Sequence, residues 1–358
     1  MSASELAKQV GVSRQTIYAI EAGTYIPNTV VAIRLARALD TTVEELFPLP
    51  EDDNAPPRHR SESATLLPGA EIPQPGQTVE LCQVDKRLMA TPPSAVPWYF
   101  PASDAVVENK PPRDGRTKVR VFQPDQDFGQ RILVAGCDPG ISVLSKHVQA
   151  AGVELVLAHR NSSQSLELLR QGVIHVAGTH LRDESSGESN LPEIGRMFGK
   201  NAVAVISFAV WEEGIVAARG NPKNIRGVED FARPDVAIVN REKGAGTRRL
   251  LDASLKAAGI SFRKVRGYGY TAAGHLPAAW QVQSGAADCC IATRAAATVL
   301  GLHFIPLVSE RYDLAVRRQH LDLAGVQKLL DTLSRSSFRR ELESLGGYDT
   351  KGAGERKL

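Results

Sequence analysis

Hydrophobic and polar residues follow two different periods along the chain, and the pattern changes near residue 131. In residues 1–48, apolar residues recur every three or four positions, as they do on the buried faces of short helices. From residue 131 onward, apolar runs such as "RILVAGCD" and "DVAIVN" alternate with amphipathic stretches such as "GTRRLLDASLKAAG". Strands that alternate with helices of this length predict mostly parallel sheets covered by helices.

The segments between these two patterns carry weaker signals. Residues 49–77 are rich in Pro, Asp, Glu and Ser, and the run "EDDNAPPRHRSES" has too few apolar residues to bury a core, so we expect a linker. Residues 78–130 alternate over short stretches that prolines interrupt, which predicts a small β-containing connector. Residues 131–350 are many for one sheet, so we expect two lobes there and a tail at residues 351–358.

Residues 1–48 carry the signals of a helix-turn-helix. Ser2 and Glu5 have the spacing of a capping box, Gly11 ends the first helix, and Ser13 begins the next after a short turn. In such a pair the second helix lies in the major groove of DNA. The exposed residues early on this helix, which are candidates for DNA contacts, are Ser13, Arg14, Gln15, Thr16 and Tyr18. Arginine and glutamine make bidentate hydrogen bonds to guanine and adenine.

Charge leaves an alternative open, because acidic residues outnumber basic ones in this segment and an ordinary three-helix bundle would look similar. However, the stretch from "ELAKQVGVSRQTIYAIEAG" to "ALDTTVEELF" resembles the repressor-type (XRE-like) helix-turn-helix family. The resemblance implies binding to a double-stranded DNA operator. One such motif reads half a site, so a homodimer is expected. Family members carry another helix before "ELAKQVG", so either the natural start lies upstream or this domain has lost that helix.

Composition narrows the class of protein further. The net charge is +3, and 42% of the residues are hydrophobic and 23% charged, which is typical of a soluble globular protein. We find neither an apolar run of the roughly 18 residues that span a bilayer nor a secretory signal. Four cysteines, Cys82, Cys137, Cys289 and Cys290, lack metal-site spacing and are interpreted as small buried hydrophobes in a reducing compartment. We therefore expect a cytoplasmic protein without a membrane partner or a metal site.

The stretch "NREKGAGTRRLLD", residues 240–252, has the features of an anion-binding loop. Glycines let the backbone approach a ligand, the following helix offers unpaired N–H groups, and Thr247, Arg241 or Arg248 can add hydrogen bonds and charge. A plain helix cap with solvated arginines is the alternative. The runs "GCDPGIS", "NSSQS", "GTHL" and "GYGYTAAGH" also follow predicted strands, where open α/β sheets bind ligands.

Residues 131–350 resemble the type II periplasmic-binding-protein-like domain related to molybdate-binding proteins. The resemblance rests on "GCDPGISVL", "VIHVAGTHL", "VNREKGAGTRRLLD" and "GLHFIPLVSERYDL". It implies two α/β lobes that clamp a ligand, with strands crossing near 208–218 and 306–316 and a second lobe at about 215–307. The implied contacts in the first lobe are Asp138, Ser142, Ser162, Ser163, Thr179 and His180. Those in the second lobe are Asn240, Arg241, Gly246, Thr247 and Arg248, with Tyr268 and His275 at the rim and Tyr312 near the hinge.

Together the two resemblances imply a ligand-responsive transcriptional regulator that is not an enzyme. Its effector would be molybdate, tungstate or another small anion such as an anionic metabolite, and no cofactor is expected. Two alternatives stay open. Two-lobed α/β folds also carry enzymes, although we find no nucleophile–base pair, metal spacing or cofactor fingerprint. The C-terminal domain could also be a dimerisation platform with a vestigial cleft.

Overall fold

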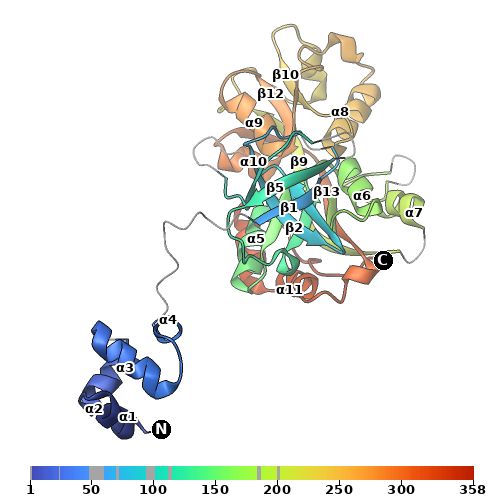
Figure 1. Cartoon of the computed structure of the whole chain (residues 1–358). Coiled ribbons are helices and arrows are strands. Elements are labelled where there is room, and N and C mark those ends of the chain that lie inside the picture. Colours follow the sequence, from blue (N-terminus) through green and yellow to red (C-terminus); the bar gives the residue numbers. More distant parts are fainter. Residues whose placement is uncertain are drawn as a thin grey trace. The chain divides into compact units, whose positions relative to one another are not determined.

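The chain forms two compact units, residues 1–59 and 60–358 (Figure 1). The computed structural model describes residues 2–23, 25–47, 60–69, 72–93, 101–111, 115–183, 187–199 and 202–358. Residues 49–59 of the predicted linker lie outside these described residues. Among the described residues, no helix has the length and hydrophobicity that crossing a membrane requires.

The described residues of the first unit form four short helices. They are α1 (Ala3–Val10), α2 (Arg14–Glu21), α3 (Thr29–Leu39) and α4 (Val43–Leu46). The predicted capping box is present, because the Ser2 hydroxyl accepts a hydrogen bond from the Glu5 N–H while the Glu5 carboxylate accepts one from the Ser2 N–H. Gly11 ends α1 with a left-handed φ of 80°, which turns the chain into α2. The helix-turn-helix prediction is thus confirmed.

The second unit begins with a small closed barrel of five strands. These are β1 (Arg60–Leu66), β2 (Thr78–Val84), β3 (Arg87–Thr91), β4 (Ala105–Val107) and β5 (Arg116–Val121). The strand order is β1-β3-β2-β4-β5, and β5 closes the barrel by pairing with β1. Alternate residues point inward and form an apolar core.

The barrel corrects the predicted linker, because β1 lies within residues 49–77. The strand "RSESATL" is polar at its start, and only Ala64 and Leu66 enter the barrel core. Its stability comes from six residue pairs with β5, from Arg60 opposite Val121 to Thr65 opposite Arg116. Composition alone does not predict such a strand, because the partner strand that stabilises it lies about fifty residues away in the sequence.

The first lobe contains a parallel sheet with helices on both faces. Its elements are η1 (Phe128–Gln130), β6 (Ile132–Gly136), α5 (Ile141–Ala150), β7 (Leu155–His159), α6 (Ser162–Arg170), β8 (Val176–Thr179) and α7 (Leu191–Phe198). Successive residues of β6 alternate between faces. Ile132 and Val134 pack with α5, α11 (Ala324–Leu333) and α12 (Ser336–Ser344), while Leu133 and Ala135 pack with α6, α7 and the barrel.

The second lobe has a smaller sheet covered in the same way. Its elements are η2 (Val228–Ala232), β10 (Ile238–Arg241), α8 (Gly246–Ala257), η3 (Phe262–Lys264), β11 (Thr271–Ala272), α9 (His275–Gln283), β12 (Cys289–Thr293) and α10 (Arg294–Val299). Two long antiparallel strands, β9 (Val203–Ala217) and β13 (His303–Arg317), run through both lobes. The nine-stranded sheet follows the order β11-β10-β12-β9-β13-β8-β6-β7, with β14 (Tyr348–Asp349) beside β9. The predicted two-lobed α/β fold is confirmed.

The predicted tail at residues 351–358 is wrong, because this segment packs along β9. The Lys357 N–H donates to the Val205 carbonyl at 2.7 Å, and the Ser207 N–H donates to the Glu355 carbonyl at 2.9 Å. The polar run "KGAGERKL" gives no hydrophobic signal, because main-chain hydrogen bonds rather than apolar side chains hold it. A final short 3-10 turn, η4 (Arg318–His320), follows β13.

A buried histidine lies where the barrel meets the first lobe. His175 Nδ1 accepts a hydrogen bond from the Leu133 N–H at 3.0 Å, and its ring lies 5.1 Å from that of His320, which is hydrogen-bonded to Asp85 of the barrel. Burial lowers the pKa of His175 to about 4, and the neighbouring His320 adds to this effect. The folded protein therefore holds His175 neutral.

This histidine predicts a loss of stability in mild acid. Between pH 6.5 and 4 the unfolded chain binds a proton that the folded chain does not, so the free energy of unfolding decreases as the pH falls through this window. From pH 7 to pH 5 we expect a loss of about 2 kcal/mol from this residue. Urea unfolding followed by tryptophan fluorescence reports on this unit, since all three tryptophans lie after residue 60. His175→Gln keeps an acceptor but does not titrate, and an equally steep pH dependence in this variant would contradict the assignment.

Candidate ligand-binding site between the lobes

Polar side chains of the first lobe lie at the carboxyl ends of its parallel strands. Cys137 and Asp138 directly follow β6, and His180 directly follows β8. Ser162, the first residue of α6, accepts a hydrogen bond from the His180 N–H at 3.1 Å. All four side chains are buried. This is the edge of the sheet at which open α/β folds bind ligands.

The second lobe presents a buried arginine and a buried histidine to the same place. Arg241 ends β10, and its Nε and Nη2 donate to the Glu242 carboxylate at 2.9 and 3.0 Å. The helix α8 begins at Gly246, so its first N–H groups lie at this interface. His275 is the first residue of α9, and its side chain is also buried.

The crossing strands add acidic and aromatic side chains that the sequence analysis did not predict. Glu213 and Trp211 lie on β9, and Glu310 lies on β13. The Thr247 hydroxyl donates to Glu213, and His180 Nδ1 is hydrogen-bonded to Glu310 at 2.9 Å. A signal was present in the sequence, since Glu213 interrupts the apolar run "FAVWEEGIVA", where a buried carboxylate requires a partner.

Seven buried polar atoms at this interface lack a hydrogen-bond partner among the described residues. They are Asp138 Oδ2, His180 Nε2, Trp211 Nε1, Glu213 Oε2, Arg241 Nη1 and both ring nitrogens of His275. A buried polar group without a partner costs roughly 1–3 kcal/mol, so folded proteins rarely contain one. A cluster of them contributed by both lobes and by the strands that cross between them therefore indicates a binding site.

The two lobes touch one another at this site. Ser163 of the first lobe donates to the Gly244 carbonyl at 3.1 Å, and Asn161 Nδ2 donates to the Lys243 carbonyl at 3.3 Å. A Cβ atom on Gly246 would lie 2.5 Å from the His180 carbonyl oxygen, so this position admits only glycine in the present arrangement. The lobes are thus closed on each other.

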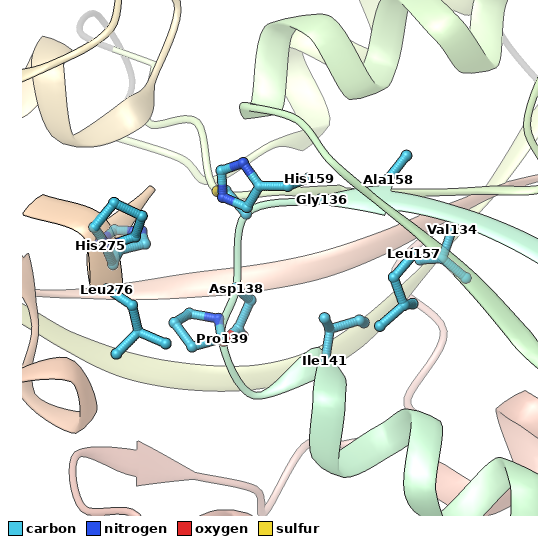
Figure 2. Close-up of a pocket in the computed structure, with 12 residues that line it drawn as sticks. Val134, Gly136, Asp138, Pro139, Ile141, Leu157, Ala158, His159, His275 and Leu276 are labelled. Carbon is cyan, nitrogen blue, oxygen red and sulfur yellow. The ribbon is translucent and has the colours of Figure 1, made fainter. Parts of the chain in front are cut away.

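A cavity of about 180 Å³ lies between the lobes next to these side chains (Figure 2). Pro139 and Ile141 line it from the first lobe, and Leu276 and Pro277 line it from the second. His275 lies at the same wall. The cavity is mostly apolar with a few polar groups, as small-molecule sites usually are.

Burial alters the ionisation of Asp138 and Glu213, the two carboxyl groups in which one oxygen lacks a partner. Burial raises the pKa of Asp138 to about 6. Burial and the nearby Glu310 raise the pKa of Glu213 to about 7. Near neutral pH these groups are therefore protonated part of the time, and a protonated carboxyl can donate a hydrogen bond to an anion.

The two histidines are shifted in opposite directions. Burial lowers the pKa of His275 well below its usual value, and the positive charges of Arg241 and His180 lower it further. Burial also opposes protonation of His180, but Cys137 and the hydrogen bond to Glu310 outweigh it and raise the pKa of His180 well above its usual value. One imidazole therefore favours its protonated form and the other its neutral form, and their ring centroids lie 5.7 Å apart.

Several predicted contacts lie outside this cluster. Ser142 is exposed, and its hydroxyl donates to the Pro139 carbonyl at 2.9 Å. Arg248 stacks on the Tyr268 ring at 4.1 Å, and both side chains are hydrogen-bonded to Asp252 of the second lobe. The Arg248 and Tyr268 side chains are therefore hydrogen-bonded within the second lobe, and these contacts do not point to a ligand.

Other predicted residues hold the site's framework. Asn240 binds the Tyr268 carbonyl and accepts from the Arg241 N–H. The Thr179 hydroxyl donates to Asn190 at 3.3 Å. The Tyr312 side chain is fully buried, and its hydroxyl would lie 1.9 Å from a Cβ on Gly178, which explains the glycine there.

The predicted DNA-binding residues lie on or next to α2. The Ser13 hydroxyl caps this helix by accepting a hydrogen bond from the Thr16 N–H at 3.0 Å. Arg14 is hydrogen-bonded to the Tyr18 hydroxyl at 2.6 Å, and Tyr18 is exposed. Gln15 is exposed and makes no hydrogen bond to the described residues that competes with a base contact. The helix therefore presents a polar surface beside an apolar core.

Comparisons with known proteins agree with both units. A helix-turn-helix family matches residues 1–46, and the PBP superfamily domain matches residues 145–334. The protein YvgK of Bacillus subtilis is 32% identical over 274 residues, which are 73% of this chain and 88% of YvgK. An HTH-type transcriptional regulator of Methanothermobacter thermautotrophicus is 49% identical over 53 residues, which are 14% of this chain and 77% of that protein.

Solved structures with a similar arrangement are more distant in sequence. The sulfate-binding protein SubI of Mycobacterium tuberculosis is 17% identical, covers 61% of this chain and 86% of its own, and has a TM-score of 0.48. The regulatory domain of CcmR from Synechocystis, in complex with 2-PG, is 16% identical, covers 56% of this chain and 94% of its own, and has a TM-score of 0.43. Since the matched domain spans more than half of the chain, this protein belongs to the PBP superfamily, and it carries an XRE-like helix-turn-helix domain at its N-terminus.

Proposed function

We propose that this protein is a transcriptional regulator whose affinity for DNA depends on a small anion bound between the two lobes of its PBP-like domain. The observation that carries the proposal is the cluster of buried polar atoms without partners at the lobe interface. A ligand that binds both lobes favours the closed arrangement, and it changes DNA affinity only as far as it prefers that arrangement. A vestigial dimerisation platform would have no reason to keep such atoms buried.

The donors at the site support an anion in particular. Arg241 offers a free N–H on a buried guanidinium, and α6 and α8 direct their first N–H groups toward the interface. Glu213 and Asp138 add acidic groups with raised pKa values, which donate when protonated. We rank molybdate and tungstate first because of the family resemblance, and other small oxyanions or anionic metabolites second. We propose binding without catalysis.

A thermal-shift screen of the full chain tests this proposal. We would use molybdate, tungstate, sulfate, phosphate and a panel of small carboxylates. A ligand at a hundred times its dissociation constant stabilises the folded state by about 2.7 kcal/mol, which raises the melting temperature measurably. The same anion must then change the affinity for an operator selected from random DNA duplexes. If no anion shifts the melting temperature, the vestigial platform becomes the better interpretation.

At the other end of the chain, we propose that α2 reads the operator and that the protein binds as a homodimer in the cytoplasm. Gln15 is exposed near the start of α2, so we expect Gln15→Ala to weaken binding to the selected operator by about 1–3 kcal/mol, roughly 5- to 150-fold. Fluorescence anisotropy measures this loss. Gln9→Ala is the matched control, because Gln9 is exposed on α1. Equal losses in the two variants would argue against α2 as the reading helix.

A further inference from the structure

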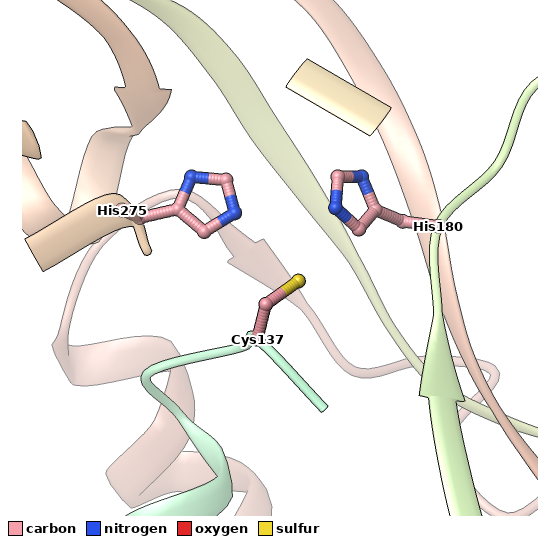
Figure 3. A group of neighbouring side chains, drawn as sticks. All are labelled: Cys137, His180 and His275. Carbon is pink, nitrogen blue, oxygen red and sulfur yellow. The ribbon is translucent and has the colours of Figure 1, made fainter. Parts of the chain in front are cut away.

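Three metal-binding side chains from separate parts of the chain meet between the lobes (Figure 3). Cys137 follows β6, His180 follows β8, and His275 begins α9 of the other lobe. Each offers one ligand atom, and these atoms lie within 4.8 Å of one another. All three residues are at least 98% buried. Local spacing in the sequence did not reveal this group, because the fold alone brings its members together.

The hydrogen bonds of the described residues leave these imidazoles unsatisfied. Neither ring nitrogen of His275 has a partner, and His180 Nε2 has none either. A buried imidazole loses its bonds to water and normally recovers them from the protein. Three unpaired nitrogen atoms on two facing rings therefore require an explanation, and the nearby thiol of Cys137 is a weak hydrogen-bonding group.

The surrounding carboxylates are arranged as they are around metal-bound histidines. Glu310 is hydrogen-bonded to His180 Nδ1 at 2.9 Å, which directs Nε2 of the same ring toward Cys137 and His275. A histidine that binds a metal through one nitrogen usually donates the other to a carboxylate in this way. Glu213 lies 3.8 Å from His275 Nδ1, and it also groups with His180 and Glu310, their ligand atoms lying within 4.8 Å of one another.

We propose that a divalent transition-metal ion of the zinc type binds between the lobes through Cys137 Sγ, His180 Nε2 and a ring nitrogen of His275. Thiolate and imidazole ligands select such ions over Mg²⁺ and Ca²⁺, which prefer oxygen. Bonds of about 2.0–2.3 Å to a shared ion place the ligand atoms roughly 3.5 Å apart, so side-chain movements on the order of 1 Å complete the site.

This metal site goes beyond the proposed function, because it adds a second ligand of opposite charge at the same interface. Two of its ligands belong to the first lobe and one belongs to the second. The ion therefore stabilises the closed arrangement, in which all three are together, over an open one. With three protein ligands, the ion also keeps a coordination position for an incoming anion.

Titration of the metal-free full chain with Co²⁺ tests the proposal. Dialysis against a chelator removes bound metal first. We expect one Co²⁺ per chain, with the thiolate-to-cobalt charge-transfer absorption in the near ultraviolet, and we expect Zn²⁺ to displace it. Cys137→Ser removes this absorption, and His275→Gln removes one of the three ligands and should therefore weaken Co²⁺ binding more than Glu310→Gln does. Glu310→Gln should weaken binding about 10- to 100-fold, because it alters the orientation of His180.

Two control variants separate the site from other thiols and histidines. Cys290 is buried in β12 and His303 is exposed on β13, so Cys290→Ser and His303→Gln should bind Co²⁺ as the unaltered chain does. Circular dichroism of each metal-free variant shows whether it folds. If a variant that lacks a ligand does not fold, the loss of Co²⁺ affinity in Glu310→Gln still tests the site. Wild-type protein that binds no Co²⁺, or a thiolate absorption that survives Cys137→Ser, would overturn the metal site. If anions raise the melting temperature and metal ions do not, only the proposed metal site is overturned. If metal ions raise it and anions do not, the proposed anion binding is overturned.

Discussion

Gly246→Ala is expected to hold the two lobes apart and to weaken ligand binding between them about 5- to 150-fold, since overpacking of this kind costs roughly 1–3 kcal/mol. The added Cβ would lie 2.5 Å from the carbonyl oxygen of His180 and 2.6 Å from its ring. The main chain of His180 is fixed by its hydrogen bond to Ser162, so the first lobe does not yield easily. Opening the lobes relieves the contact, and the closed population decreases accordingly.

Isothermal titration of the full chain measures this effect for the anion and for Zn²⁺ separately. Gly269→Ala is the matched control, because Gly269 also lies in the second lobe and a Cβ there meets no atom within 4 Å. The melting temperature without ligand should change little in either variant, since the core of each lobe is untouched. Wild-type affinity in Gly246→Ala would mean that ligands bind without the closure seen here.

The fold of the second unit could be predicted wherever hydrophobic side chains carry it. The strand β6, for example, is a continuous apolar run, because both faces of the sheet are covered by helices. The strand β1 and residues 351–358 escaped prediction for the opposite reason. Main-chain pairing with β5 and with β9 holds them, and pairing between distant segments leaves no local pattern.

The site was predictable only in part for a related reason. The rule that ligands bind at strand ends, together with the family resemblance, indicated Asp138, His180, Arg241 and His275, and the structure brings these residues together. Glu213 and Glu310 lie inside long crossing strands, away from the strand ends to which the rule points. Arg248 was predicted from the anion-binding loop and Tyr268 from the family resemblance, but in the structure the two side chains stack on each other and are hydrogen-bonded to Asp252 within the second lobe.

Arg241→Met is expected to remove most of the anion affinity. Loss of a buried, charged hydrogen-bond donor typically costs 2–5 kcal/mol, which corresponds to roughly 30- to 5,000-fold in the dissociation constant. The free Nη1 of Arg241 is a guanidinium N–H that is buried and unpaired among the described residues at the lobe interface. Methionine has a flexible side chain that can fill much of the same space, and Glu242 is 24% exposed and can turn to solvent.

The same variant separates the two ligands proposed for this interface. A metal held by Cys137, His180 and His275 needs no help from Arg241, whose positive charge opposes a cation, so Arg241→Met should bind Zn²⁺ at least as tightly as the unaltered chain. Isothermal titration with the anion and with Zn²⁺ should therefore give opposite results in this variant. If both affinities fell together while the metal-free protein kept its melting temperature, the arginine would position the loop of the second lobe rather than bind the anion. Unchanged anion binding would place the anion away from the paired lobes altogether, and the unpaired atoms would then belong to the metal site alone.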